Sequence, residues 1–446
     1  MAARRIVPGV LLAVALGSLP AGAQDVPNGL AGLLPRFFSP ENPVILEDNP
    51  VPAFSHAAHF VSQPGAQATL RQINRGVASQ ISTFPLGSSA ASFTYEFDPS
   101  LGVYNRSTES FGPIFGERAI TAGKGKFSFG VNFLDATYDK FEGLDLQGGN
   151  DIQLYLVHQD PAMDGRLTPW FEGDIIRADL TLDLEQQTTA LFANYGITDR
   201  LDVGVAIPFQ HLRLDARIDA TIEHLATDPD PFTLHQFPNG QGDHSSFYES
   251  GSATGVGDIV VRSKWNFLKA SSAGMAATLD LRLPTGNADD LLGSGATQLK
   301  LGLVAAKFSG RFAPRAGAGY TFSSGGADFL GDLPNELNYR AGFDAVLHRR
   351  VTLTADFLGR TLFDAERLVL VQQDFQFDQR TDPTVRDVER LTPGSAVSNL
   401  NLFLVSAGLK VNPFGRLLLV GNVLFGVGDD GLQDKVTPAV GLEYSF

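Results

Sequence analysis

Residues 335–360 read NELNYRAGFDAVLHRRVTLTADFLGR, and apolar and polar side chains alternate along both halves of this stretch. One face of the first half carries Leu337, Tyr339, Ala341, Phe343, Ala345 and Leu347, and the other carries Asn338, Arg340, Gly342 and Asp344. Successive side chains of a β-strand point to opposite faces, so each half is predicted to be a strand with one apolar face. The short polar turn His348-Arg349-Arg350 between them predicts an antiparallel hairpin.

The same alternation recurs along the chain, for example in residues 127–133 and 275–283. No segment after the N-terminus has the roughly 18 consecutive apolar residues of a membrane-spanning helix. A soluble sandwich and a transmembrane barrel both use such strands, and the connections distinguish them. Short turns, such as residues 198–200 and 348–350, alternate strictly with long polar connections, such as 223–255 and 363–398. This alternation is typical of outer-membrane barrels, which have short periplasmic turns and long outer loops.

The fold predicted for residues 90–446 is therefore an all-β, transmembrane antiparallel β-barrel. About fourteen strands can be placed, with twelve as the alternative because the two near Ala91 and Ser110 are the weakest. Two expected strands, residues 177–197 and 201–222, exceed the roughly 9–11 residues needed to cross a bilayer. Both also change the parity of their alternation, near residues 185–189 and 210–211. Facing β-bulges would explain this change, and so would the border between lipid and water.

The N-terminus is predicted to be a signal peptide, residues 1–23. Arg4 and Arg5 precede a short apolar stretch, and Ala21-Gly22-Ala23 supplies small residues at Ala21 and Ala23 for cleavage. Export followed by barrel formation predicts the outer membrane of a Gram-negative bacterium.

Residues 24–89 lack strand alternation and are predicted to form an N-terminal plug or a periplasmic segment. The first half is rich in proline, whereas Leu70, Ile73, Val77 and Ile81 recur at helical spacing in the second half. A wide barrel has an interior that its own side chains cannot fill, which favours the plug.

The C-terminus is predicted to be an assembly signal. Leu442, Tyr444 and Phe446 share one face of the last predicted strand, and Phe446 ends the chain. This pattern resembles the terminal strand that the barrel-assembly machinery of outer membranes reads. Outer-membrane lipid, lipopolysaccharide and that machinery are the expected partners.

Composition excludes several classes of function. The formal net charge of -15 argues against binding to nucleic acid, because a phosphate-binding surface is basic. The absence of cysteine excludes thiolate metal sites and a cysteine nucleophile. His56 and His59 have the spacing of metal ligands, but no third ligand accompanies them. No catalytic residue, cofactor site or metal site is therefore predicted, and the chain is not expected to be an enzyme.

The polar faces of the predicted strands supply the candidates for lining the lumen: Asn132, Arg262, Lys264, Asp280, Arg282, Lys300, Arg340, Asp344, Asp356, Arg360 and Asn422. A turn near Ser271 places Arg262 opposite Asp280, and a turn at Arg349 places Arg340 diagonal to Asp356. Cross-strand pairs of opposite charge are mildly stabilising. These residues are interpreted either as the lining of a selective pore or as charges that satisfy one another in a plugged lumen.

Three motifs resemble a family of outer-membrane barrels named for the meta-pathway of phenol degradation. They are residues 195–208 (YGITDRLDVGVAIP), residues 255–258 (GVGD) and residues 283–286 (LPTG), in the family's order and spacing. The resemblance covers roughly residue 188 to the end of the chain. It implies an outer-membrane channel or transporter for a small solute, with hydrophobic and aromatic compounds as candidates. It implies no substrate residues, and a non-transporting barrel whose long outer loops bind a surface partner stays open as the alternative.

Overall fold

The barrel wall of the computed structural model is made of twelve antiparallel strands. The structure describes residues 29–38, 44, 46, 60–62, 64–83, 85–87, 92–98, 100, 103–149, 151–158, 166–168, 170–227 and 235–446. The wall strands are β4 (Phe127–Tyr138), β9 (Ile175–Thr198), β10 (Leu201–Glu223), β12 (Val260–Lys269), β13 (Ala273–Arg282), β14 (Thr297–Lys307), β15 (Phe312–Ser324), β16 (Glu336–His348), β17 (Val351–Gln379), β18 (Asp382–Val411), β19 (Leu417–Val427) and β21 (Thr437–Ser445). Each pairs with the next, and β21 pairs with β4 to close the barrel.

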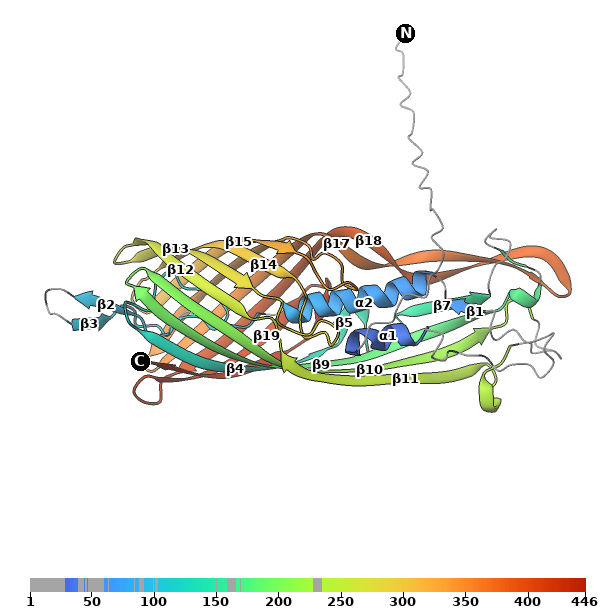
Figure 1. Ribbon diagram of the computed structural model, residues 1–446, viewed down its shortest axis with the longest axis horizontal. Coiled ribbons are helices and arrows are strands. Elements are labelled where there is room, and N and C mark those ends of the chain that lie inside the picture. The colour runs from blue at the N-terminus through green and yellow to red at the C-terminus, as the bar shows by residue number, and fades with distance from the viewer. Residues whose placement is uncertain are drawn as a thin grey trace, which may run out of the picture.

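The predicted antiparallel β-barrel is confirmed, and its wall has twelve strands among the described residues, the alternative count rather than about fourteen. The two weakest expected strands are not part of the wall. β2 (Tyr95–Asp98) pairs with β3 (Val103–Arg106) as a separate hairpin, and residues 107–126 contain no strand. The hairpin projects from the end of the barrel that carries the short turns (Figure 1). In outer-membrane barrels that end faces the periplasm.

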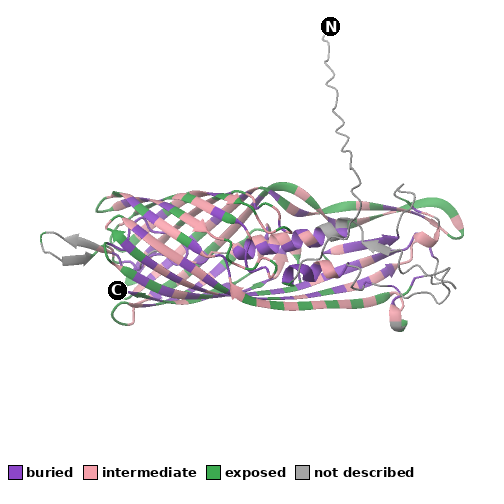
Figure 2. Cartoon of the chain, in the orientation of Figure 1, coloured by how far each residue is buried: buried purple, intermediate pink, exposed green. Residues whose placement is uncertain are grey.

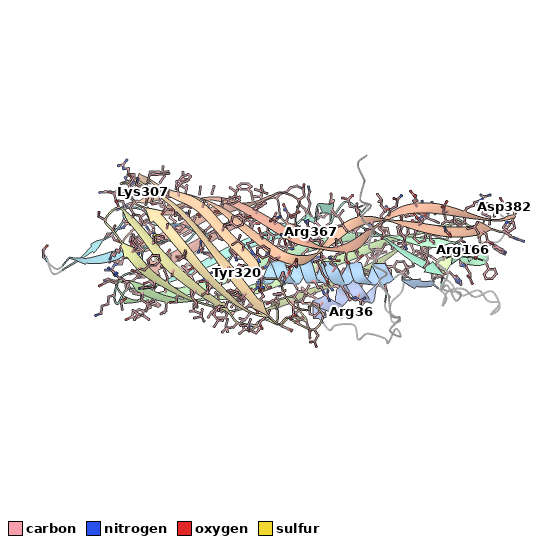
Figure 3. All side chains as sticks on the ribbon, turned by 90° about the horizontal axis from the view of Figure 1, so that it is seen from above. Arg36, Arg166, Lys307, Tyr320, Arg367 and Asp382 are labelled. Carbon is pink, nitrogen blue, oxygen red and sulfur yellow. The ribbon has the colours of Figure 1, made fainter. Side chains whose placement is uncertain are left out.

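At the opposite end several strands continue well beyond the barrel (Figure 1). Residues 175–179 of β9 pair with β7 (Gln153–His158), which pairs with β1 (Phe60–Ser62). Residues 209–221 of β10 pair with β11 (His244–Val256). β8 (Arg166–Leu167) pairs with β17. We call this part of the molecule the extension. Residues 363–398, expected to be a polar connection, instead continue β17 and β18 as one long hairpin that ends near Asp382 (Figure 3).

The change of alternation in β9 and β10 marks the lipid–water border. The two strands pair without a shift of register from Asp202 to Glu223, so no bulge lies at residues 185–189 or 210–211. Even-numbered residues of β9 are buried throughout, but they change from apolar Leu180, Leu182 and Leu184 to polar Gln186 and Thr188. The outward residues of β9 change from polar to apolar over the same stretch, as expected where a strand leaves water and enters lipid.

The largest apolar core lies in the extension. α2 (Pro64–Ser82) is largely buried there, and Figure 2 shows most of its ribbon in purple between the long strands. Leu70, Ile73 and Ile81 pack with the inward leucines of β9 and β10 in one cluster. η1 (Gly29–Gly32) and α1 (Leu33–Arg36) join the same cluster. Burial of the apolar face of α2 therefore stabilises strands that have no lipid around them.

The remaining short elements lie in the connections between wall strands. They are β5 (Lys140–Phe141), β6 (Leu144–Asp145), β20 (Leu432–Gln433), η4 (Trp170–Glu172) and η5 (Pro238–Gly240). β5 pairs with both β6 and β20 near the outer rim. Among the described residues, no helix combines the length and the apolar character needed to cross a bilayer.

Candidate functional site

Residues between α2 and β4 enter the barrel. We call residues 85–87, 92–94 and 107–126 the inner segment. Phe111, Ile114 and Ala119 of this segment are buried. Its backbone is bonded to inward side chains of the wall: Phe111 N donates to Thr352 Oγ1 at 3.2 Å, and Gly116 N donates to Asp356 Oδ2 at 3.2 Å. The inner segment is thus held by polar groups of the wall.

Buried ion pairs connect the wall strands beside the inner segment. Arg315 lies 2.5 Å from both Asp344 and Asp356. Ser110 Oγ of the inner segment donates to Asp344 at 3.2 Å. Lys410 lies 3.5 Å from Glu443, which also accepts a hydrogen bond from Ser92 N at 2.7 Å. A buried charge is tolerated only when it is paired and hydrogen-bonded, and both clusters meet that condition.

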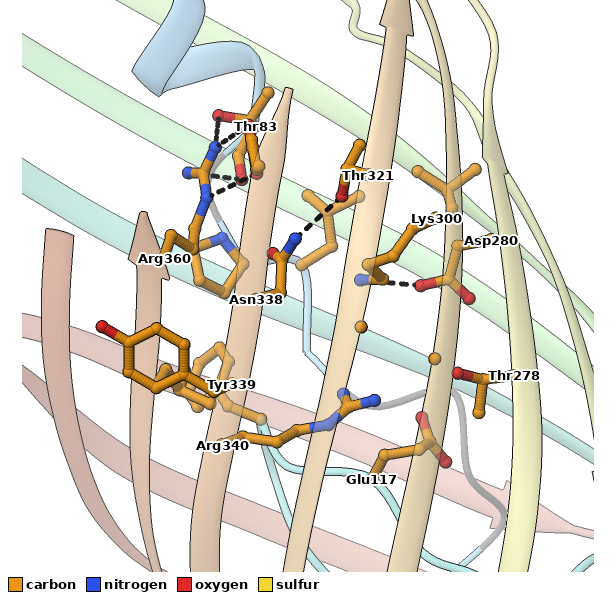
Figure 4. Close-up of a pocket in the computed structure, with 18 of the residues that line it drawn as sticks. Thr83, Glu117, Thr278, Asp280, Lys300, Thr321, Asn338, Tyr339, Arg340 and Arg360 are labelled. Carbon is orange, nitrogen blue, oxygen red and sulfur yellow. Dashed lines mark hydrogen bonds and ion pairs between the residues drawn. The ribbon is translucent and has the colours of Figure 1, made fainter. Parts of the chain in front are cut away.

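A cavity of about 150 Å³ lies between the wall and the inner segment (Figure 4). β12 to β17 form its wall, and Pro85, Leu86, Gly87, Phe115 and Glu117 close it from the inner side. Inward positions of β14 and β15 in its lining are glycine, Gly302 and Gly319. A Cβ at Gly302 would lie 2.7 Å from Oγ1 of Thr278, another side chain of the lining. Missing side chains at these positions leave the space open.

Five basic and three acidic side chains line the cavity: Arg262, Arg282, Lys300, Arg340, Arg360, Glu117, Asp280 and Glu336. Asp280 lies 2.9 Å from Lys300 and 4.0 Å from Arg262. Arg360 donates two hydrogen bonds to Glu336, at 2.6 and 3.1 Å. Each of these two carboxylates is thus bound to a cation of the same cavity.

Six of the eleven residues that the sequence placed in the lumen line this cavity: Arg262, Asp280, Arg282, Lys300, Arg340 and Arg360. The other five are buried elsewhere: Asn132, Lys264, Asp344, Asp356 and Asn422. The expected register is present, with Arg262 opposite Asp280 and Asp356 diagonal to Arg340. Asp356, however, binds Arg315.

Several buried charges were missed by the sequence reasoning. Arg315, Glu336, Lys410 and Glu443 lie at inward positions, and strand parity alone could have found them. Glu117 could not be found this way, because the inner segment has no alternation. Lys264 pairs with Glu117 at 3.0 Å, so this contact joins wall and inner segment.

Leu442, Tyr444 and Phe446 of the predicted assembly signal are exposed on the outer surface of the barrel. Ala21 and Ala23, His56 and His59 lie outside the described residues.

The three sequence motifs have structural roles. Residues 195–208 form the hairpin between β9 and β10. Gly286 N donates to Asp258 Oδ1 at 3.1 Å, and Thr285 Oγ1 donates to the carbonyl of Gly257 at 2.8 Å. The second and third motifs therefore bind each other at the outer rim, where β12 begins and β13 ends.

Comparison with known families decides the classification. A family model described as "Putative MetA-pathway of phenol degradation" matches residues 174–401. The chain belongs to this family. The family match begins directly before β9, at the outer end of this strand, and ends within β18. It therefore includes the three motifs and all the strands that form the wall of the cavity. No curated protein matches the chain.

Solved structures similar to this family member include outer-membrane proteins. An outer membrane channel from Pseudomonas putida F1 has 14% identity and a TM-score of 0.41, over 74% of this chain and 98% of that chain. A Pseudomonas aeruginosa FadL homologue has 11% identity and a TM-score of 0.29, over 72% and 90%. The Ralstonia pickettii toluene transporter TbuX has 11% identity and a TM-score of 0.26, over 73% and 90%.

A histidine–carboxylate cluster lies at the far end of the extension. His224 Nδ1 and His235 Nδ1 lie 3.1 and 2.9 Å from Asp174 Oδ2, and His224 Nε2 lies 3.0 Å from Asp243. The hydrogen bond to Asp174, with a further contribution from Asp243, raises the pKa of His224 to about 9. His224 is consequently protonated at neutral pH in the folded state.

This raised pKa has a defined effect on stability. A pKa above the unfolded value of about 6.5 stabilises the folded state fully below that value, and the stabilisation is lost as pH rises through about 9. With Trp265→Phe as background, we expect the urea midpoint of the Trp170 fluorescence to be lower at pH 10 than at pH 6. His224→Gln should remove most of this difference. An equal difference in that variant would contradict the assignment.

Proposed function

We propose that this chain is a channel of the Gram-negative outer membrane for small solutes, with hydrophobic and aromatic compounds as the candidate class. The observation that carries the proposal is the charge-lined cavity enclosed between the barrel wall and the inner segment. A barrel serving only as a scaffold has no need of an internal cavity with eight charged side chains. We assign no catalytic step to these residues.

The proposal gives α2 and the inner segment the role of a plug. α2 is held in the extension by Arg75, which lies 2.6 Å from Glu366, and by Thr69, which donates to the carbonyl of Pro393 at 3.1 Å. Below it, the inner segment is bound to the wall by polar contacts and by small apolar clusters that contain Phe111, Ile114 and Ala119. The polar contacts can be exchanged for water, and these clusters are far smaller than the core around α2, so movement of the inner segment would open a passage while that core stays buried.

An engineered disulfide tests the plug directly. The chain has no cysteine, so two introduced cysteines are the only pair that can form. A Cβ built at Gly274 of β13 lies 3.4 Å from Cβ of Ala119 in the inner segment, close to the separation in disulfides. We expect Ala119→Cys/Gly274→Cys, reconstituted in planar bilayers, to conduct several-fold less when oxidised than after addition of reductant.

The two single-cysteine variants are the matched controls, and reductant should not change their conductance. Equal conductance of the oxidised and reduced double variant would contradict the role of the inner segment as a plug. No conductance in the wild type or in the reduced variant would contradict the channel itself.

A barrel whose extension binds a surface partner is the second candidate. The outer part of the hairpin formed by β17 and β18 exposes Leu370, Leu391 and Val397, well beyond the membrane-spanning part. Exposed apolar side chains on a water-facing hairpin are typical of a contact surface. Shortening this hairpin should leave conductance unchanged if its only role is binding.

A further inference from the structure

We infer that the cavity binds an aromatic carboxylate with a single ring. The inference rests on the proposed channel function and assigns the chemical class of its solute. It depends on three features of the cavity: an excess of positive charge, the guanidinium of Arg340, which no described residue binds, and a size that fits one ring.

The acidic side chains of the cavity are already occupied. Asp280 is bound by Lys300, and Glu336 accepts hydrogen bonds from Nε and Nη2 of Arg360. Glu117 is bound by Lys264, a cation that does not line the cavity. With five basic and three acidic side chains, the lining has a formal excess of two positive charges.

Arg340 is the cation that remains available. Its side chain extends from β16 into the middle of the cavity, between Glu117 and the pair formed by Lys300 and Asp280 (Figure 4). Within the part of the chain that the structure describes, the side chain of Arg340 makes no hydrogen bond or ion pair. Nε of Arg262 is likewise buried without a hydrogen bond, although Asp280 Oδ1 lies 4.0 Å away. Among the described residues, these two cations of the cavity thus keep donors that no protein acceptor binds.

An anion satisfies these groups better than a neutral molecule does. Transfer of a guanidinium out of water is costly unless the charge is paired and hydrogen-bonded. A neutral hydrocarbon would displace water from Arg340 and supply no acceptor. A carboxylate supplies two acceptor oxygens that match the planar fork of arginine.

The size and the remaining lining favour one aromatic ring. A cavity of about 150 Å³ is large enough for a molecule the size of benzene. Leu86, Phe115 and Leu358 contribute apolar surface to the same cavity. A ring against these side chains would leave its carboxylate free to reach Arg340 and Lys300, which both extend into the cavity (Figure 4).

Calorimetric titration of the detergent-solubilised full chain with benzoate tests the inference. Benzamide serves as the neutral molecule of the same shape, and acetate as the carboxylate without a ring. We expect benzoate to bind more tightly than either. Arg340→Gln should weaken benzoate roughly tenfold or more, because a hydrogen bond between charged groups is lost. Arg340→Lys, which keeps the charge, should retain part of the affinity.

Arg349→Gln is the matched control, since Arg349 is an exposed arginine in the turn after β16. It should bind benzoate as the wild type does, and all variants should show the same heat-dependent gel mobility as a check on folding. Equal binding of benzoate and benzamide, or unchanged binding in Arg340→Gln, would overturn the anion assignment. Equal binding of acetate would overturn the ring. Absence of benzoate binding in a barrel that still conducts after reduction of the disulfide would reject this inference alone.

Discussion

Replacing Arg315 with methionine should destabilise the barrel by about 3–5 kcal/mol, the usual cost of leaving a buried charge without its partner. Arg315 is the only cation within ion-pair distance of Asp344 and Asp356 in the described part of the chain. The side chains of both aspartates are at most 3% exposed. Water therefore cannot replace the lost guanidinium. Urea unfolding of the barrel in lipid vesicles, followed by tryptophan fluorescence, measures the loss.

The same substitution should loosen the inner segment. Ser110 and Gly116 donate hydrogen bonds to Asp344 and Asp356, and these carboxylates would become protonated or would move once Arg315 is gone. Arg311→Met, at an exposed turn four residues earlier, is the control and should change stability by less than about 0.5 kcal/mol.

Adding Asp344→Asn and Asp356→Asn to Arg315→Met should recover a large part of the loss, since no charge is then left unpaired. If the free energy of unfolding of Arg315→Met alone lies within about 1 kcal/mol of wild type, the cluster of Arg315, Asp344 and Asp356 is not the desolvated network described above.

The wall of the barrel could be predicted from the sequence because lipid imposes a simple rule on it. Outward side chains in the membrane-spanning part of each wall strand must be apolar, so alternation alone identified the strands and placed Arg262 opposite Asp280. The count failed for the two strands expected to start near residues 91 and 110, because β2 and β3 form a hairpin outside the wall and residues 107–126 contain no strand. No local pattern distinguishes such a run from a wall strand. Closure of the sheet by β21 and β4 is a long-range property of the fold.

The cavity could be predicted only in part. Its wall residues follow from strand parity, whereas Glu117 and Phe115 belong to a segment without periodicity, and only the folded structure brings them to the wall. Which charges form pairs likewise depends on whether a long basic side chain extends across a neighbouring strand to a carboxylate. Asp356 was expected near Arg340, but Arg315 of β15 reaches it across Gly342 of β16 and makes a buried contact at 2.5 Å. Arg340 was left without a partner for the same reason, and this makes it the most informative residue of the cavity.

The change of alternation in β9 leads to the second large effect. Ala193 and Gln187 lie on the same outward face of β9, six residues apart, and the border between them separates lipid from water. Ala193 is five residues from Thr198 at the turn end, near the middle of the roughly ten residues that cross a bilayer.

Ala193→Arg should therefore cost about 2–4 kcal/mol, the value for arginine on the lipid face at the midplane, whereas Gln187→Arg should cost about 0–1 kcal/mol. Both variants carry the same added charge on the same strand, so the difference between their urea midpoints reports depth alone. If the parity change reflected a pair of bulges within the membrane, both positions would lie at similar depth and both substitutions would destabilise the barrel. A difference of several-fold between the two costs places the border at residues 187–193 and makes the outer half of β9 part of a water-exposed extension.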